Sequence, residues 1–520
     1  MRFLFAVLGA FQCILAASSP SSPQFHLSLV GDGSGDYMLD WVTSVDEKSS
    51  TVFFGASNDS LANKADGTSS GNVVVTPSLS VQCWHARLSG LGAAGSTVHY
   101  DLSSTGTTSK SFVVSGPSMT WAIFGDMGSI AMKKASGITL PALTSDLAAK
   151  SYQGILNLGD LAYELVETNG DVYMQQLEPL TSVVPMHTTI GNHEMQYAMF
   201  GALPNYIRRF AGLAAGAGRA SGSSSNRFYS FNAGYVHFVV IDTEVYGDQS
   251  FMTPGTDGFW SSSETARGQM QETQRSWLEY DLSRVKRKVT PFVVVCGHRP
   301  PSKIPNAITK PGNQFAAQLL PLLDMYSVDL MFFGHEHAYY SIEPTVVGKY
   351  NVPPWIISGA AGNNELIRPV SKVSMDPVFK VRKNINEYGY GYLKATADKL
   401  VWTWGQAATS SPNGESPTST SWTAADSVEF LKKDIADPTP TGKPVMVPET
   451  APTNNVTIAA AGSAAPAASP ESSKNTQAGP SGQSGSTSVS PTQSNSGGTS
   501  LVSNAIAMVM VVVAIALGSA

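Results

Sequence analysis

One local pattern occurs five times in the middle of this chain: an apolar run ends at a glycine, and the next residue carries a potential metal ligand. In open α/β sheets, the loops at the carboxyl ends of strands converge on the binding site. A glycine at such a point lets the backbone turn sharply and leaves space for a cation. Each pair taken alone is most simply a turn, but five together favour a metal site. The pairs are Gly125-Asp126, Gly159-Asp160, Gly191-Asn192, Gly297-His298 and Gly334-His335.

The last of these pairs lies in the stretch "GHEH", where two imidazoles stand two positions apart. Residues i and i+2 of an extended backbone point to the same side. We therefore expect His335 and His337 to face one site, where they can bind two neighbouring ions, while Glu336 points away. Their spacing differs from the helical H-E-x-x-H motif of zinc peptidases.

The chemistry of the donors constrains the metals. Carboxylate, amide and imidazole groups together suit borderline transition metals rather than calcium, and no thiolate belongs to the set. Tyr163, in "GDLAYE", adds a phenolate, a hard anionic donor that favours Fe(III), and the Asp160 carboxylate can bridge two ions. Cys296, two residues before His298, is interpreted as a buried thiol in the strand.

The segments around the five pairs alternate between short apolar strands and helices. Strands such as "GILNLGD" and "PFVVVCGH" are separated by helical segments such as "LPALTSDLAAKS" and "ETARGQMQETQRSWLEYDLSRVK". This alternation predicts a layered α/β domain over residues 119–405, closed by an antiparallel pair near residue 404.

The region before it, residues 22–116, has a different pattern. About seven short strands, rich in β-branched and aromatic residues and bounded by turn residues, predict an all-β sandwich of the fibronectin or immunoglobulin type. We interpret it as a structural or docking module. The expected strands cover 25–31, 37–44, 50–57, 72–78, 85–91, 96–104 and 109–115.

Both ends of the chain indicate export. Residues 1–18 have the pattern of a secretory signal peptide. After residue 405 the composition turns to Ser, Thr, Pro, Gly and Ala, which predicts a disordered stalk over 406–496, with periodicity fully lost from about 437. Residues 497–520 form a short apolar tail with no basic residue after it, which favours a GPI-attachment signal; a single-pass span is the alternative. Asn58 and Asn455 are N-glycosylation acceptors.

The bulk composition excludes one class of function. Charged residues make up only 14% of the chain, and the formal net charge is −6, with no basic cluster. A nucleic-acid partner is therefore not expected. The mature chain would keep only Cys83 and Cys296, which we expect to be buried thiols rather than a disulfide. The sequence does not indicate an oligomeric state.

The ordered motifs GDMG, GDLAY, GNHE, VCGH and GHEH resemble those of the metallophosphoesterases and, through the tyrosine of GDLAY, the purple acid phosphatases. The resemblance covers residues 22–405 and is closest to the long plant-type and fungal form, which has a fibronectin type III-like N-terminal domain. It implies a catalytic domain built as a layered β-sandwich flanked by helices. It also implies a dinuclear centre that hydrolyses phosphate monoesters at acidic pH by attack of a metal-bound hydroxide.

The same resemblance implies a role for each candidate residue. Fe(III) would be bound by Asp126, Asp160, Tyr163 and His337, and a divalent Zn, Fe or Mn by Asp160, Asn192, His298 and His335. His193 of GNHE would contact the phosphate and protonate the leaving alkoxide, with Glu194 orienting it; alternatively, His193 only positions other groups.

The chain departs from the family after the fourth motif, in "GHRPPSKIPNAITKPGNQF". Ser302 stands where plant-type members carry a tyrosine, and the further histidines are missing. Arg299 is either a phosphate contact or a structural arginine. Two other functions compete with the monoesterase: a phosphodiesterase or nucleotide pyrophosphatase with the same ions, whose substrate choice would depend on loops such as 243–265, and a non-enzymatic cell-surface protein.

Overall fold

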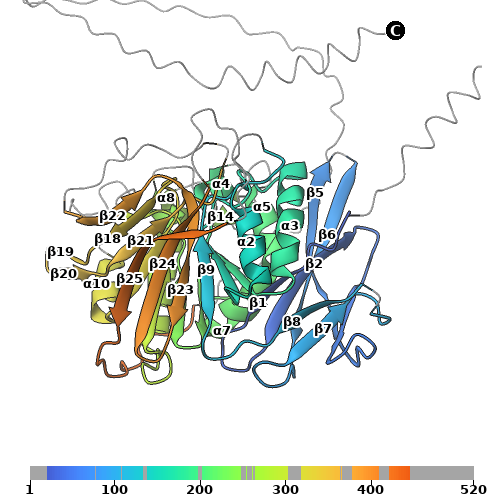
Figure 1. Cartoon of the computed structure of the whole chain (residues 1–520), viewed down its shortest axis with the longest axis horizontal. Coiled ribbons are helices and arrows are strands. Elements are labelled where there is room, and N and C mark those ends of the chain that lie inside the picture. The colour runs from blue at the N-terminus through green and yellow to red at the C-terminus, as the bar shows by residue number, and fades with distance from the viewer. Residues whose placement is uncertain are drawn as a thin grey trace, which may run out of the picture. The chain divides into compact units, whose positions relative to one another are not determined.

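Two four-stranded antiparallel sheets form the N-terminal module in the computed structural model (Figure 1). The model describes residues 20–76, 78–106, 108–132, 137–196, 202–247, 253–254, 260–261, 264–301, 318–363, 365, 378–408 and 421–445. The first sheet has the order β1 (His26–Leu29), β2 (Tyr37–Ser44), β6 (Leu79–Leu88), β5 (Thr68–Thr76), and the second β4 (Asn63–Asp66), β3 (Thr51–Gly55), β7 (Thr97–Asp101), β8 (Lys110–Val113).

Aromatic side chains hold these two sheets together as a sandwich. The rings of Tyr37 on β2 and Phe112 on β8 lie 4.7 Å apart, and Trp41, Phe54 and Tyr100 are buried in the same core. The predicted sandwich is therefore present, with eight strands instead of about seven. The unexpected strand is β4, whose sequence NKAD is polar and mostly exposed and lacks the apolar alternation that marks a strand.

Two larger sheets form the second part of the protein. The six-stranded sheet has the order β11 (Met186–Thr188), β10 (Gly154–Asn157), β9 (Thr120–Phe124), β23 (Tyr388–Ala395), β24 (Lys399–Ala408), β25 (Thr423–Leu431). Its strands β9, β10 and β11 are parallel. The seven-stranded sheet has the order β12 (Tyr229–Ala233), β13 (Val236–Val240), β16 (Phe292–Cys296), β17 (Leu330–Phe333), β21 (Trp355–Ser358), β18 (Tyr339–Ile342), β22 (Val381–Ile385), and β13, β16, β17 and β21 are parallel.

These two sheets pack face to face. Trp121 on β9 contacts Phe238 on β13 with ring centroids 5.2 Å apart, and Phe332 on β17 contacts Trp402 on β24 at 4.8 Å. The strands at this interface are buried along nearly their whole length, as their continuous apolar sequences FVVVC and LMFF predict.

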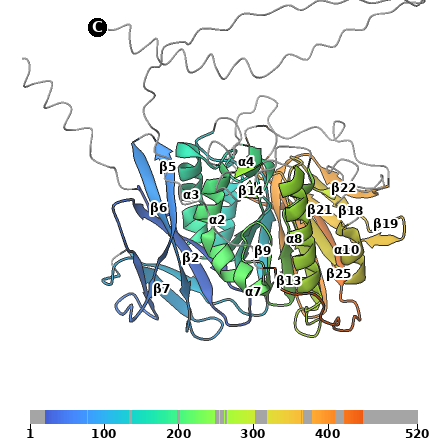
Figure 2. The ribbon, with the colours of Figure 1, turned by 180° about the vertical axis from the view of Figure 1, so that it is seen from behind.

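Helices cover the two outer faces. On the six-stranded sheet, α2 (Leu140–Ala148) bonds to β23 through Asp146 and Tyr390, and α3 (Glu167–Thr181) bonds to β10 through Tyr173 and Asn157. Helices α8 (Glu264–Leu282) and α10 (Leu320–Met325) lie on the side of the seven-stranded sheet (Figure 2). The observed architecture confirms the predicted layered β-sandwich flanked by helices.

The remaining elements are short and connect these layers. They are α4 (Asn192–Gln196), α5 (Ala202–Arg209), α6 (Ala211–Leu213), the π-helix η2 (Ala214–Gly218), α7 (Arg219–Ser221), the 3₁₀ turn η3 (Glu244–Tyr246), and the strand pairs β14 (Thr253–Pro254) with β15 (Trp260–Ser261) and β19 (Thr345–Val347) with β20 (Tyr350–Val352).

The N-terminal module packs against α3 and β11, and the two parts share one hydrophobic core. The backbone N–H of Leu29 on β1 donates to Nε2 of His187 on β11 at 3.1 Å, and the Tyr100 hydroxyl donates to the carbonyl of Ser182 at 2.7 Å. In both views the module lies beside α3 (Figures 1 and 2). The contacts bind the module firmly to the region that precedes the GNHE motif.

The predicted boundary between catalytic domain and stalk at residues 405 and 406 is wrong. Strand β24 continues to Ala408, and β25 adds a further strand to the same sheet. Beyond it, Lys433 pairs with Asp329 at 3.2 Å, and the backbone N–H of Thr441 donates to Ser283 at 3.0 Å. β25 escaped prediction because it is an edge strand whose residues are exposed or only partly buried, so its composition is nearly as polar as that of a linker.

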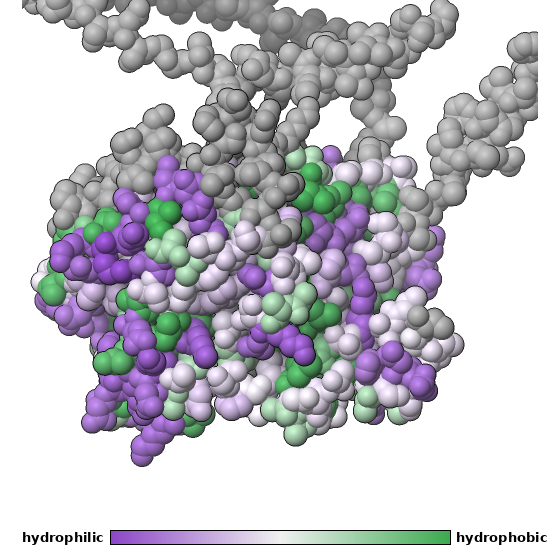
Figure 3. Space-filling model, viewed as in Figure 1, coloured by the Kyte–Doolittle hydropathy of each residue, from purple (hydrophilic) through white to green (hydrophobic). Residues whose placement is uncertain are grey.

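Several predicted segments lie outside the described residues: the signal peptide, the stalk beyond residue 445, Asn455 and the C-terminal tail. Within the described part, no helix is long and apolar enough to cross a membrane. On the face shown in Figure 3, strongly hydrophilic side chains are interrupted by broad areas of intermediate hydropathy, consistent with a charged content of 14%.

Candidate metal centre

The carboxyl ends of the parallel strands bring the predicted ligands together from both sheets. Asp126 follows β9 and Asp160 follows β10 in the six-stranded sheet, while His298 follows β16 and His335 follows β17 in the seven-stranded sheet. Asn192 begins α4, after β11. The converging ends meet where the two sheets face each other, as the five glycine-ligand pairs predict.

Sharp backbone turns place these side chains. Asp126, Asp160 and His335 have φ angles of 61°, 49° and 69°, in the left-handed region that lets the chain reverse directly after a strand. The preceding glycines permit close approach: a Cβ on Gly334 would lie 2.6 Å from Oδ2 of Asp126. Strain of this kind concentrates at functional sites.

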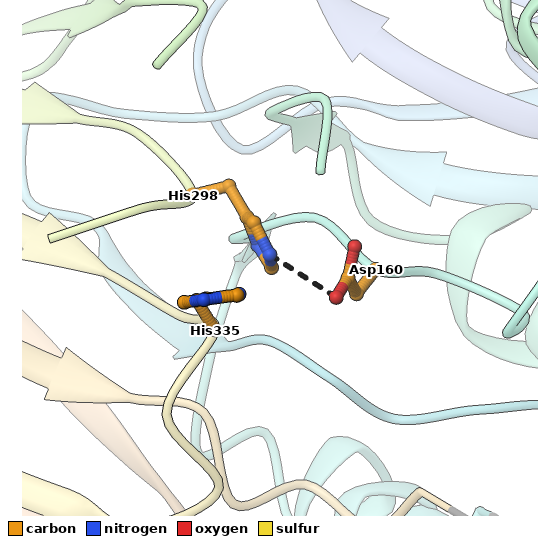
Figure 4. Close-up of side chains that lie close together, drawn as sticks. All are labelled: Asp160, His298 and His335. Carbon is orange, nitrogen blue, oxygen red and sulfur yellow. Dashed lines mark ion pairs between the residues drawn. The ribbon is translucent and has the colours of Figure 1, made fainter. Parts of the chain in front are cut away.

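One cluster of ligand atoms consists of Asp160, His298 and His335, whose donor atoms all lie within 4.8 Å of one another (Figure 4). Nε2 of His298 lies 3.1 Å from Oδ2 of Asp160 and 3.2 Å from Oδ1 of Asn192. Nδ1 of His298 donates to the carbonyl of Leu158 at 2.7 Å, which fixes the ring with Nε2 toward the cluster.

Charge couples the members of this cluster. Burial alone would lower the pKa of His298, but the Asp160 carboxylate outweighs it and raises the pKa to about 10. Burial alone would raise the pKa of Asp160, but the imidazoles of His298 and His193 hold that pKa well below its usual range. A cation bound here would take the place of the imidazolium proton.

A second cluster consists of Asp126, Tyr163 and His337. The Tyr163 hydroxyl lies 3.1 Å from Oδ1 of Asp126 and 2.7 Å from Nε2 of His337, and that Nε2 lies 3.6 Å from the Asp126 oxygen. Burial, followed by the neighbouring carboxylates, raises the pKa of Tyr163 well above its usual range, and burial likewise raises the pKa of Asp126. Both shifts favour the neutral forms, and a cation would reverse them. The donors therefore fit a metal ion.

His335 and His337 converge, but the predicted reason was wrong. Strand β17 ends at Phe333, residues 335–338 form bends, and His335 has a positive φ, so the backbone is not extended here. Both histidines nevertheless contact Asp126: the backbone N–H of His335 donates to Oδ2 at 2.9 Å, and His337 approaches Oδ1.

His193 stands beside the two clusters and is oriented by Glu164. Its Nδ1 lies 3.0 Å from Oε1 of Glu164, and its Nε2 lies 3.9 Å from Oδ2 of Asp160 and 3.8 Å from Oε1 of Glu365. Burial lowers the pKa of His193, but Asp160 and Glu164 outweigh it and raise the pKa to about 9. Neither glutamate was predicted from the sequence. Glu164 adjoins Tyr163 in the second motif, whereas nothing in the local sequence marks Glu365.

Glu194 does not orient His193, contrary to the prediction. Its side chain is fully buried, and its two oxygens accept backbone hydrogen bonds from Asp160 at 3.0 Å, Leu161 at 2.9 Å and Gly191 at 2.9 Å. Consecutive residues in a helix point about 100° apart, so in α4 Glu194 faces the strand ends while His193 faces the clusters.

Four further residues were singled out in the sequence. Arg299 is buried beside His335, with its Nη1 2.9 Å from Nε2 of that histidine. Cys83 and Cys296 are free and buried, as predicted. Ser302 lies outside the described residues, as do residues 248–252, 255–259 and 262–263 of the loop 243–265 that was expected to influence substrate choice.

Comparison with known proteins shows what this chain is similar to. Residues 119–339 match the calcineurin-like phosphoesterase family. The chain is 28% identical over 428 residues to acid phosphatase type 7 of Mus musculus, covering 73% of this chain and 89% of the relative. It is 28% identical over 403 residues to purple acid phosphatase 18 of Arabidopsis thaliana, covering 74% and 82%. The chain is a homologue of the purple acid phosphatases.

A solved structure supports the fold of this purple acid phosphatase homologue. A purple acid phosphatase from yellow lupin (Lupinus luteus) seeds matches 81% of this chain and 77% of its own length, with a TM-score of 0.54 and 15% identity. The protein is accordingly a phosphoesterase enzyme. Its family implies phosphate-ester substrates and a dinuclear metal centre, consistent with the candidate site.

Proposed function

We propose that the protein is an acid phosphatase that hydrolyses phosphate monoesters at an Fe(III)–M(II) centre, where M is Zn, Fe or Mn. The observation that carries the proposal is the division of six donors into two adjacent clusters, with Asn192 as a seventh donor beside His298. Tyr163 lies in one cluster with Asp126 and His337. Asp160, which we assign as the bridge, lies in the other with His298 and His335.

The chain's own residues would divide the work. When bound, two cations supply charge neutralisation for the phosphate oxygens and lower the pKa of water. Asp126, Tyr163 and His337 would hold the first ion, and Tyr163 as a phenolate would favour Fe(III). Asn192, His298 and His335 would hold the second ion, with Asp160 between the two. Glu194 keeps the loops that carry Asp160 and Gly191 at a fixed separation.

His193 is the group we assign to proton transfer. Glu164 binds its Nδ1, which leaves Nε2 directed toward the clusters at 3.9 Å from Asp160. A protonated imidazole in this position would donate to the leaving alkoxide. The carboxylates of Asp160 and Glu164 outweigh burial and raise the pKa of His193 to about 9, which favours the charged form that a general acid needs.

The test is hydrolysis of p-nitrophenyl phosphate against bis(p-nitrophenyl) phosphate at pH 5 by metal-loaded protein. The proposal predicts a higher kcat/KM for the monoester. A higher value for the diester would favour the phosphodiesterase alternative. Activity toward neither substrate, in protein that contains both metals, would favour the non-enzymatic alternative.

We further propose that the enzyme is secreted and held at the cell surface by a GPI anchor. The leader-like pattern of residues 1–18 and the short apolar tail support this. Asn58 lies exposed in the N-terminal module, as a glycosylation acceptor must. Treatment of intact cells with a phosphatidylinositol-specific phospholipase should release the activity. Activity that stays with the membrane, in protein that retains its C-terminal peptide, would indicate a spanning helix instead.

A further inference from the structure

The Arg299 guanidinium is buried at the edge of the candidate metal centre with only part of its hydrogen-bonding capacity used. Its Nε donates to Oε2 of Glu244 at 2.8 Å, and its Nη1 donates to Nε2 of His335 at 2.9 Å. Nη2 is buried and has no hydrogen-bond partner among the described residues. The side chain of Arg299 is only 6% exposed, so solvent does not satisfy that nitrogen.

The surrounding chain fixes this arginine in place. Oγ1 of Thr243 accepts the backbone N–H groups of both His298, at 3.1 Å, and Arg299, at 2.7 Å. Glu244, which follows Thr243, is itself buried and holds Nε. One short segment therefore positions a candidate ligand, the arginine and the carboxylate that anchors it.

A purely structural role explains this arrangement poorly. A guanidinium is always protonated and carries five N–H donors. A buried charge is stabilising only when its donors are satisfied. Within the described part of the chain, Nη2 of Arg299 has no acceptor and Nη1 uses an imidazole. Arg287, another deeply buried arginine, instead donates from Nη1 to Asp329 at 2.6 Å and from Nη2 to two carbonyl oxygens.

The bond to His335 is also incompatible with a bound cation. A neutral imidazole has a free lone pair on only one of its two ring nitrogens. A cation bound at either nitrogen of His335 would therefore remove the acceptor that Nη1 of Arg299 uses. Both terminal nitrogens would then need another acceptor, while Nε stays held by Glu244.

We propose that Arg299 is a phosphate-binding residue of this centre, anchored by Glu244; the inference rests on the function proposed above. Its two terminal nitrogens form a planar fork that matches two oxygens of a phosphate group. Nη2 then gains the acceptor that the described residues do not supply. The same geometry makes Arg299 a competitor of the second metal ion for His335, so phosphate binding and metal binding should respond to its removal in opposite directions.

The experiment compares Arg299→Gln with wild-type protein after metal loading. Inorganic phosphate is titrated calorimetrically and used as a competitive inhibitor of p-nitrophenyl phosphate hydrolysis. The phosphate dissociation constant should rise by about 10- to 100-fold, the range expected for a lost charge-assisted hydrogen bond. The affinity for the second metal, measured by competition with a chelator, should stay the same or increase. Arg299→Lys, which keeps the charge, should recover part of the phosphate affinity.

Arg287→Gln is the matched control, because it also removes a buried, carboxylate-paired arginine. It should lower thermal stability without changing the phosphate constant. If Arg299→Gln fails to fold, Glu244→Gln tests the anchor while keeping the arginine, and should also weaken phosphate binding. Unchanged phosphate affinity in Arg299→Gln, or metal and phosphate affinity that fall together, would overturn the inference. Wild-type protein that binds phosphate through Arg299 and yet hydrolyses no ester would contradict the proposed function alone.

Discussion

Glu194 accepts a hydrogen bond from the backbone N–H of Asp160 at 3.0 Å. Glu194 directly follows His193, the proposed proton donor, but its side chain supports Asp160, the proposed bridging ligand. The same carboxylate also binds the N–H groups of Leu161 and Gly191. It therefore joins the loop after β10 to the loop that leads into Asn192. Groups that hold ligands in this way commonly change metal affinity 10- to 100-fold when they are removed.

Glu194→Gln should weaken metal binding without removing a ligand. The glutamine NH₂ would meet at least one of the three backbone donors, which costs about 1–3 kcal/mol of unfolding free energy. We expect metal affinity to fall about tenfold, measured by chelator competition, together with a lower midpoint of chemical denaturation. Glu178→Gln, which alters another buried glutamate, on α3 and near Lys110, should affect only stability. Metal affinity unchanged by Glu194→Gln would show that the carboxylate is only a packing element.

Asp160→Asn and His193→Ala should separate metal binding from proton transfer. Asp160→Asn removes the carboxylate assigned to both ions, and metal content should fall for both. His193→Ala should keep both ions and lower kcat by about a hundredfold or more, as expected for a lost general acid. Metal analysis of each purified variant, alongside its kcat, checks this. Equal metal loss in the two variants would contradict the assigned roles.

The contact between the N-terminal module and β11 should make stability depend on pH. Burial lowers the pKa of His187 to about 3, and its Nε2 accepts the Leu29 N–H, so protonation would break that bond. In the unfolded chain a histidine titrates near pH 6.5. Between these values the unfolded state binds more protons, so His187 stabilises the fold above pH 6.5, and this contribution is lost as the pH falls toward 3.

The expected loss from His187 is about 2 kcal/mol of unfolding free energy between pH 7.5 and pH 5. Denaturant unfolding of wild-type protein and His187→Gln at both pH values measures it. The variant should be less stable at pH 7.5 and should show a smaller pH dependence. His99→Gln, at a partly exposed histidine on β7, serves as the control. An identical pH slope in wild-type protein and His187→Gln would rule out this role.

The sequence predicted those parts of the site that follow from strand ends. Glycine-ligand pairs after apolar strands are local signals, and parallel pairing brings Asp126, Asp160, His298 and His335 together once the strands are known. Glu365 lies beyond β21 and meets His193 only through tertiary folding, so no local pattern marks it. The role of Glu194 depends on the direction of its side chain in a five-residue helix. The residue types in the GNHE motif do not indicate that direction.

Strands at the edges of the sheets were predicted less well than buried central strands, because their side chains are polar. β16 and β17 are buried strands with unbroken apolar sequences. β4 and β25 are edge strands held by backbone pairing to one neighbour, and their polar side chains resemble those of loops. Backbone pairing leaves little trace in composition, so the C-terminal limit of the domain was placed too early.

The proposed dinuclear centre with Tyr163 on Fe(III) can be tested by the visible spectrum and the metal content of the purified protein. A centre of this kind should hold two metal ions per chain, at least one of them iron. Its phenolate-to-iron charge-transfer band should give the protein a colour. Tyr163→Phe should lose the band while keeping the fold and much of the activity. Colourless wild-type protein with full iron occupancy would contradict the assignment of Tyr163 to Fe(III). Protein that binds a single ion at saturation would contradict the dinuclear centre.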